Sequence, residues 1–201
     1  MTSEAILLVR ATCIPLMEPY YDSKLAYHNV GHVYDMLSQL AYYADEITLA
    51  YPNLDWESVV TAILWHDAMY SPKSSINEFT AATKFREVVG YNYRVISLIL
   101  STAQGYTGYK SPEEKVLHDL DYICFNSSND LRKASDQVIK EYVYAGFPEE
   151  DCISGRISFL EDLLSSGGVF VSDVFVSRFS NKPKLAIEAD ITRLRNSVSE
   201  L

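Results

Sequence analysis

Residues 55–70 read DWESVVTAILWHDAMY, and their apolar side chains recur at helical spacing. A helix turns by about 100° per residue, so one face collects the apolar residues Val59, Val60 and Ile63. Asp55 precedes this pattern as an N-cap, and Ser71-Pro72 follows it as a stop. The spacing therefore predicts a helix that runs from Asp55 to about Tyr70.

The same helical periodicity extends outward in both directions, with caps or breakers between the segments. The remaining expected helices cover residues 4–18, 30–48, 75–89, 92–103, 112–124, 129–145, 148–166 and 182–200. Residues 169–176 are compatible with either a strand or a short helix. Because no repeat, low-complexity tract or linker-like composition interrupts the pattern, we expect one all-α domain over residues 1–201, a single helical bundle.

The composition and net charge of the chain limit the classes of partner that we expect. The chain has 201 residues, 17 basic and 27 acidic, for a net charge of −10. That field repels a polyphosphate backbone, so a nucleic-acid polymer is not expected as a partner. A hydrophobic fraction of 48% excludes a disordered chain. A homodimer is compatible with the fifteen tyrosines.

The start of the sequence, MTSEAILLVRATCIPLME, lacks the basic region and long apolar stretch of a signal peptide. No run approaches the roughly eighteen apolar residues of a membrane span, so no membrane is expected as a partner. Cys13, Cys124 and Cys152 are odd in number, far apart and form no C-x-x-C pair. These features predict a cytoplasmic protein.

Three of the four histidines lie in two short motifs, YHNVGHV at 27–33 and WHDAMY at 65–70. His66 and Asp67 follow Ile63 by three and four residues, so they fall on the apolar face of the predicted helix. A buried ionised carboxylate costs several kcal/mol unless something pairs with it. One divalent cation would satisfy both residues, whereas a purely structural role would require two separate buried partners.

The predicted helix at 112–124 supplies a further carboxylate. Asp121 lies inside the apolar stripe of that helix, while Asp119 lies on the opposite side and is expected to be solvated. His32 lies at the edge of the apolar face of the segment 30–48. Two imidazoles and two carboxylates suit one divalent ion, Mn²⁺, Fe²⁺, Co²⁺, Ni²⁺ or Mg²⁺, with coordination positions left for water and substrate. The set is His32, His66, Asp67 and Asp121.

The order H…HD…D on a helical chain resembles the HD-domain superfamily of metal-dependent phosphohydrolases, and more narrowly the small "predicted metal-dependent HD phosphohydrolase" family. The motifs that carry the resemblance are YHNVGHV at 27–33, HDAMYSP at 66–72, NE at 77–78, DLDYICF at 119–125, EY at 141–142 and GR at 155–156. They span most of the chain. The resemblance implies an HD-domain-like bundle with the metal site between helices, and a hydrolase that cleaves a phosphate ester or anhydride of a small molecule, preferably a nucleotide.

The resemblance also implies roles around the metal. The ligands would be His32, His66, Asp67 and Asp121. Asp67 would also take or share the proton of the attacking water, and His28 would contact the phosphate or donate a proton to the leaving oxygen. Glu78 would hold the water or orient His66; the alternative is a capping box with Ser75.

Further residues have two interpretations each. Asn77 would contact substrate or cap a helix, and Lys73 would contact a phosphate or lie in solvent. Tyr27 and Tyr70 would stack on a base, whereas core packing is expected for Trp65. An ion pair between helices is expected for Glu141 and for Arg156, rather than a catalytic role.

Two alternatives stay open. A di-iron oxygenase of HD type would need about six ligands with several histidines, but residues 101–105 contain none and His118 lies off the stripe that carries Asp121. A nucleotide-binding or regulatory module on the same fold would keep the ligands without turnover. Metal content per chain and phosphate release distinguish these alternatives from the hydrolase.

Overall fold

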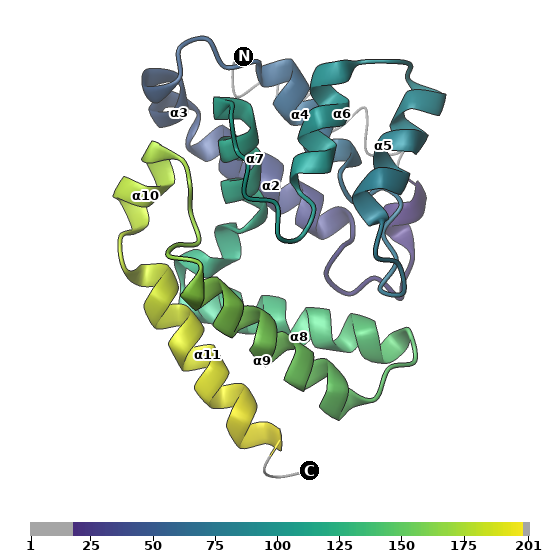
Figure 1. Ribbon diagram of the computed structural model, residues 1–201, viewed down its shortest axis with the longest axis vertical. Helices are drawn as coiled ribbons and strands as arrows, with labels where there is room; N and C mark the ends of the chain where they lie inside the picture. The colour runs from purple at the N-terminus through teal and green to yellow at the C-terminus, as the bar shows by residue number, and fades with distance from the viewer. Residues whose placement is uncertain (1–17, 199–201) are drawn as a thin grey trace.

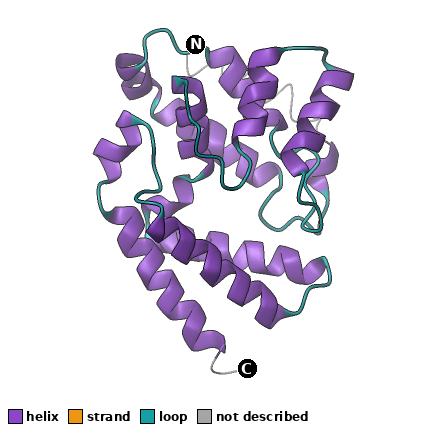
Figure 2. Ribbon diagram, viewed as in Figure 1, coloured by secondary structure: helices purple, strands orange, loops and turns teal. Residues whose placement is uncertain are grey.

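The computed structural model describes residues 18–198 of the chain. Helices joined by loops and turns make up this part (Figures 1 and 2). Ten α-helices and two short 3-10 helices occur in this range, and it contains no strand. The all-α prediction is therefore confirmed. Most of the helix expected at residues 4–18, and Cys13 with it, lies outside the described residues.

The elements follow one another with short connections. In chain order they are η2 (Glu18–Tyr21), α2 (Val30–Tyr42), α3 (Ala44–Ala50), α4 (Trp56–Trp65), α5 (Asn77–Val88), α6 (Tyr93–Ser101), α7 (Pro112–Asp121), η3 (Ile123–Asn126), α8 (Ser128–Tyr144), α9 (Glu149–Ser165), α10 (Asp173–Phe179) and α11 (Lys182–Val198). Helices α2 to α7 form an N-terminal group, and α8, α9 and α11 pack together below it in Figure 1. Helix α10 returns to the N-terminal group and packs on α3.

Helix α4 occupies the centre of the N-terminal group, in contact with α2, α5, α6 and α7. Its predicted apolar face, Val59, Val60 and Ile63, is buried, and Asp55 caps the helix by accepting the backbone N–H of Ser58. Burying one such side chain stabilises the fold by about 1.5–3 kcal/mol. The buried apolar face of α4 therefore holds together the helices that contain the predicted site residues.

Two predicted helix boundaries are wrong. The single helix expected at 30–48 is divided at Tyr43, whose buried ring packs edge-on against Phe175 with centroids 5.0 Å apart. Helix α4 ends at Trp65 rather than near Tyr70, and residues 66–69 form a turn. His66 is thus the C-cap of α4 and Asp67 lies just beyond it.

The predicted capping box at Ser75 is also wrong, because Ile76 is the N-cap of α5 and makes no side-chain cap. A capping box is instead found at Ser111, whose hydroxyl accepts the Glu114 N–H while the Glu114 carboxylate accepts the Ser111 N–H. The ambiguous segment 169–176 leads into helix α10, which Ser172 caps. None of the described helices combines the length and hydropathy needed to cross a bilayer.

Candidate metal centre

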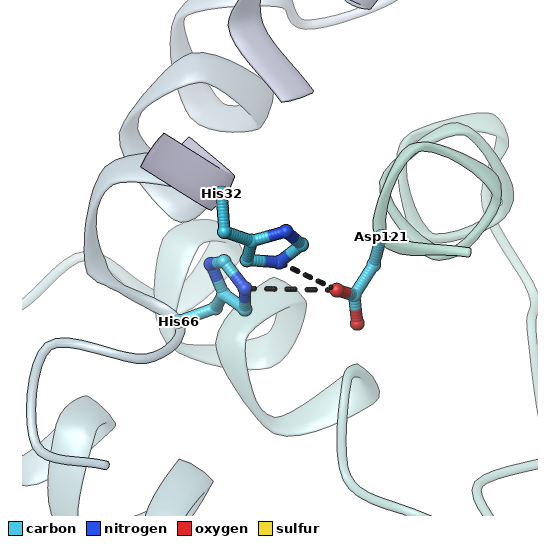
Figure 3. Close-up of side chains that lie close together, drawn as sticks. All are labelled: His32, His66 and Asp121. Atoms are coloured by element: carbon cyan, nitrogen blue, oxygen red, sulfur yellow. Dashed lines mark hydrogen bonds and ion pairs between the residues drawn. The ribbon is translucent and has the colours of Figure 1, made fainter. Parts of the chain in front are cut away.

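Three predicted ligands meet where three helices end or begin (Figure 3). His32 lies in the first turn of α2, His66 caps the end of α4, and Asp121 is the last residue of α7. Oδ1 of Asp121 is 3.0 Å from Nε2 of His32 and 3.9 Å from Nε2 of His66. One donor atom from each residue lies within 4.8 Å of the others.

Asp67 joins this cluster from the turn after α4. Its Oδ2 is 3.0 Å from Nε2 of His66 and 4.0 Å from Nε2 of His32. Its backbone N–H donates to the hydroxyl of the buried Tyr20 at 3.1 Å, which fixes the turn. The four predicted ligands are therefore in one place, and we call His32, His66, Asp67 and Asp121 the ligand group.

A tight N-cap sets the position of His32. The side chain of Asn29 accepts the Gly31 N–H at 2.7 Å, and α2 starts at Val30. A Cβ at position 31 would come within 2.9 Å of Oδ1 of Asn29, so glycine lets this cap close. Because the helix starts after Asn29, His28 lies in the preceding loop rather than one helical turn before His32.

The hydrogen bond at Nδ1 of His66 turns Nε2 toward the ligand group, where the neutral ring carries its lone pair. Its Nδ1 is 3.0 Å from the carbonyl oxygen of Ile63, which only accepts, so Nδ1 donates that hydrogen bond. Nε2 is buried and has no hydrogen-bond partner, although Oδ2 of Asp67 is near. A metal-binding histidine is held in this way, with one ring nitrogen bonded to a carbonyl and the other free for the ion.

The charges of the group favour a cation. Burial lowers the pKa of His66, but the charges of Asp67 and Asp121 outweigh it and raise the pKa to about 9. Burial raises the pKa of Asp67, but the charges of His66 and His28 outweigh it, so that pKa lies well below its usual value. Two ionised carboxylates thus attract a positive charge, and a divalent ion would compete with the His66 proton for it.

The spacing of the donors fits one divalent ion. Ligands about 2.1 Å from an ion lie about 3.0 Å apart when adjacent in an octahedron and about 4.2 Å apart when opposite. The four separations between an imidazole nitrogen and a carboxylate oxygen in the group are 3.0, 3.0, 3.9 and 4.0 Å. Two nitrogens and two oxygens at these distances are a suitable donor set for the ions expected from the sequence.

His28 is held beside the group by a carboxylate from α8. Nδ1 of His28 donates to Oε1 of Glu141 at 2.6 Å, and Oε2 accepts the backbone N–H groups of Tyr27 and His28 at 3.0 and 3.1 Å. Burial lowers the pKa of His28, but the Asp67 charge and the Glu141 hydrogen bond outweigh it and raise the pKa. The expectation that Glu141 forms an ion pair between helices is wrong: its partner is a loop histidine 113 residues away in sequence.

A cavity of about 700 Å³ opens at the ligand group, between the N-terminal helices and the pair α8 and α9. Its walls include the predicted residues Tyr27, His28, His66, Asp67, Tyr70, Asn77, Glu78 and Asp121. The same cavity is also lined by aromatic side chains, Tyr122, Phe125, Tyr142, Phe147 and Phe159. A second cavity of about 610 Å³ lies beyond His32 and shares Tyr27, Asp121 and Cys124 with the first. Cavities of this size accommodate small-molecule ligands.

The residues predicted to contact substrate differ in whether their side chains already bond or stack with other residues. Tyr70 stacks on His28 with ring centroids 3.6 Å apart, so one of its faces is occupied. The amide of Asn77 bonds the backbone of Ser71 and Ser74 and thereby closes the loop before α5. Glu78, which does not form the capping box, remains available in the cavity wall.

Lys73 and Trp65 lie outside the cavity wall that the structure describes. Lys73 is exposed, and its Nζ is 4.0 Å from the point where a Cβ on Gly146 would be, across the connection between α8 and α9. The Trp65 ring packs edge-on against Phe85 at 5.5 Å, as expected for core packing.

The prediction that Asp119 is solvated is wrong, because this residue is fully buried. Its carboxylate accepts the backbone N–H groups of Val171 and Ser172, both at 2.8 Å, and the Ser172 hydroxyl. The helical pattern of residues 112–124 locates one apolar face, and the segment before α10 covers the other. Asp119 therefore stabilises the path of the chain rather than a metal.

His118 is likewise engaged outside the group. Its Nε2 is 2.9 Å from the carbonyl oxygen of Val169, and its Nδ1 is 2.6 Å from the Tyr109 hydroxyl. A carbonyl only accepts, so Nε2 donates and Nδ1 accepts from Tyr109. Burial lowers the pKa of His118, which favours this neutral form.

Sequence reasoning missed Tyr20, and for Glu141 and Arg156 it expected only an ion pair between helices. Tyr20 holds the Asp67 backbone, Glu141 holds His28, and Arg156 lines the cavity. Their partners are distant in sequence, so no local spacing could have identified them.

Comparison with protein-family models, curated proteins and solved structures gives no match to this chain.

Proposed function

We propose that this protein is a metal-dependent phosphohydrolase that cleaves a phosphate ester or anhydride of a small molecule, preferably a nucleotide. The observation that supports it best is the buried Nε2 of His66, which makes no hydrogen bond and points at the other members of the ligand group beside a large cavity. The resemblance of the motifs to HD-domain phosphohydrolases supports the same reaction. One divalent ion is the proposed cofactor.

Such an ion would lower the pKa of a bound water to ~7 and polarise a phosphoryl oxygen. The residues of the chain supply the rest. Asp67 lies at the boundary between the ligand group and the cavity, where its carboxylate can take or share a proton from the attacking water. The hydrogen bond from the Asp67 backbone N–H to the Tyr20 hydroxyl keeps that carboxylate in place.

His28 is suited to donate a proton to the leaving oxygen. Glu141 accepts the Nδ1 hydrogen, so a second proton on the ring is carried by Nε2. The raised pKa of His28 favours this doubly protonated form near neutral pH. Stacking on Tyr70 prevents the ring from rotating away.

The walls of the cavity favour an aromatic group in the substrate. Tyr142 and Phe147 line this cavity, and bases stack on such rings. The volume of about 700 Å³ exceeds what a phosphate alone requires. These features support a nucleotide as the substrate class.

A di-iron oxygenase is disfavoured by how the four histidines are used. His32 and His66 belong to the ligand group, His28 bonds Glu141, and His118 bonds Val169 and Tyr109. Outside the ligand group, only Nε2 of His28 is left among the imidazole nitrogens, and one such donor does not supply the several histidines that a second iron would need.

The test is phosphate release from a panel of nucleotides with Mn²⁺ or Co²⁺, together with metal content per chain. Wild type should hold about one ion, and Asp67→Ala and His66→Ala should lose both the ion and turnover. Asp45→Asn, an exposed change on α3, is the matched control and should alter neither. Full activity in either alanine variant would refute the site. Nucleotide binding without phosphate release would favour a regulatory module, and two irons per chain would favour an oxygenase.

A further inference from the structure

Arg156 is held rigidly in the cavity wall. It lies on α9, and its Nε donates to the Ser135 hydroxyl on α8 at 3.0 Å; Ser135 is fully buried. The guanidinium carbon lies 5.0 Å from the ring centroid of Phe159 and 5.9 Å from that of Phe125. One hydrogen bond and two aromatic rings thus hold the guanidinium group in place.

The charge of Arg156 has no carboxylate partner within 4.0 Å in the described part of the chain. It is also the one lysine or arginine among the described residues that line this cavity. Carboxylates line it in several places: Asp67, Glu78, Asp121 and Asp151. A guanidinium has five N–H donors, of which Nε is used, so the donors on its two terminal nitrogens remain.

A purely structural role does not account for this charge. A neutral side chain of similar length would fill the space beside Phe159, whereas a half-buried cation without a counter-ion loses hydration. Guanidinium groups held flat on aromatic rings are typical binding sites for carboxylates and phosphates, which accept two parallel hydrogen bonds.

Arg156 is close to the ligand group. Burial raises the pKa of the Cys124 thiol to about 11, and the Arg156 charge acts against that rise. The same charge opposes the raised pKa of Tyr27, whose ring lies 4.9 Å from that of His32. Arg156, Tyr27 and Cys124 line the same cavity as three members of the ligand group, His66, Asp67 and Asp121.

We propose that Arg156 binds a second anionic group of the substrate, while the scissile phosphate lies at the ligand group. The substrate class is then a small phosphate compound with two anionic groups, joined by a spacer that lies against the aromatic side chains of the cavity. The second group is a phosphate or a carboxylate, since both match the guanidinium fork. This inference rests on the proposed phosphohydrolase function and defines its substrate more narrowly.

The experiment uses three compounds matched in their scissile phosphate: butyl phosphate, phosphonooxybutyrate and butanediol bisphosphate. Wild type loaded with Mn²⁺ should hydrolyse the two doubly anionic compounds with a kcat/KM about 10- to 100-fold above that for butyl phosphate, the effect of one charged hydrogen-bonded pair. A preference for one of the two identifies the second group as carboxylate or phosphate. Calorimetric titration of the same compounds measures affinity independently of turnover.

Arg156→Met should remove most of this preference, mainly through KM, and Arg156→Lys should restore part of it. Arg132→Met, an exposed change on α8, should leave it unchanged. Metal content and the thermal midpoint show whether each variant is folded, and Arg156→Lys remains informative if Arg156→Met is not. Two results would overturn the inference: equal kcat/KM and equal affinity for the three compounds in wild type, or an undiminished preference in Arg156→Met. Neither result would contradict the proposed hydrolase function. If none is hydrolysed, the calorimetric comparison alone decides the role of Arg156, while the nucleotide panel decides the hydrolase.

Discussion

Glu141 offers the sharpest test of how the site is assembled. Its carboxylate is 1% exposed and accepts three hydrogen bonds, one from the His28 ring and two from backbone N–H groups of Tyr27 and His28. Glutamine has the same shape but a single acceptor oxygen. If that oxygen keeps the two backbone bonds, its NH₂ group faces Nδ1 of His28, and the ring must become an acceptor there.

The magnitude follows from these contacts. Glu141→Gln exchanges a charged hydrogen bond of about 1.5–3 kcal/mol for a weaker neutral one, so unfolding should become easier by about 1–2 kcal/mol. For a chain of about 200 residues this lowers the Tm by roughly 2–8 °C. Glu141→Ala leaves three donors without an acceptor and should cost about 3–6 kcal/mol.

Two measurements together test the argument. Thermal denaturation gives the stability change, and the pH profile of phosphate release reports whether His28 still carries its second proton. Glu141→Gln should reduce kcat about 10²- to 10⁴-fold, the range of a general acid's contribution, and leave metal content unchanged. Glu87→Gln, an exposed change on α5, should shift stability by less than about 0.5 kcal/mol. An unchanged Tm and kcat in Glu141→Gln would refute the role of Glu141.

Three further outcomes are expected. Asp119→Asn should lower the free energy of unfolding in urea by about 1–3 kcal/mol, because an amide group would face a buried N–H of Val171 or Ser172; an unaltered midpoint would contradict this. Mn²⁺ at about 100 times its Kd should raise the free energy of unfolding by about 2.7 kcal/mol, an increase that His66→Ala should remove and that EDTA should reverse. Burial raises the pKa of Cys124 to about 11, so alkylation of this thiol at pH 8 should be about 100-fold slower than that of an exposed cysteine and should accelerate up to about pH 11. Mass spectrometry measures the rate of alkylation. Rapid labelling at pH 8 would show that the thiol is not shielded.

The sequence predicted helices well where one helix face is continuous. The stripes of α2 and α4 are buried as expected, and Asp55 caps α4. Helix ends were less predictable. The apolar pattern continues past Trp65, yet the chain turns there, because Tyr20 binds the Asp67 backbone from another part of the chain. Similarly, Ser75 and Glu78 match the letters of a capping box, but Asn77 ties its side chain to the preceding loop and Ile76 takes the cap position.

Within the site, the sequence alone determined which residue types gather: two histidines and two aspartates, each on or beside an apolar helix face. Helical periodicity supports that inference because it reports which side of a helix is buried. Only the tertiary structure decided that Asp119 is buried under residues 171–172, that Glu141 holds His28, and that Arg156 faces the cavity. Each depends on a polar side chain meeting a segment far away in the chain. Local spacing carries no information on such contacts, since the partner of a buried charge is chosen by how the helices pack.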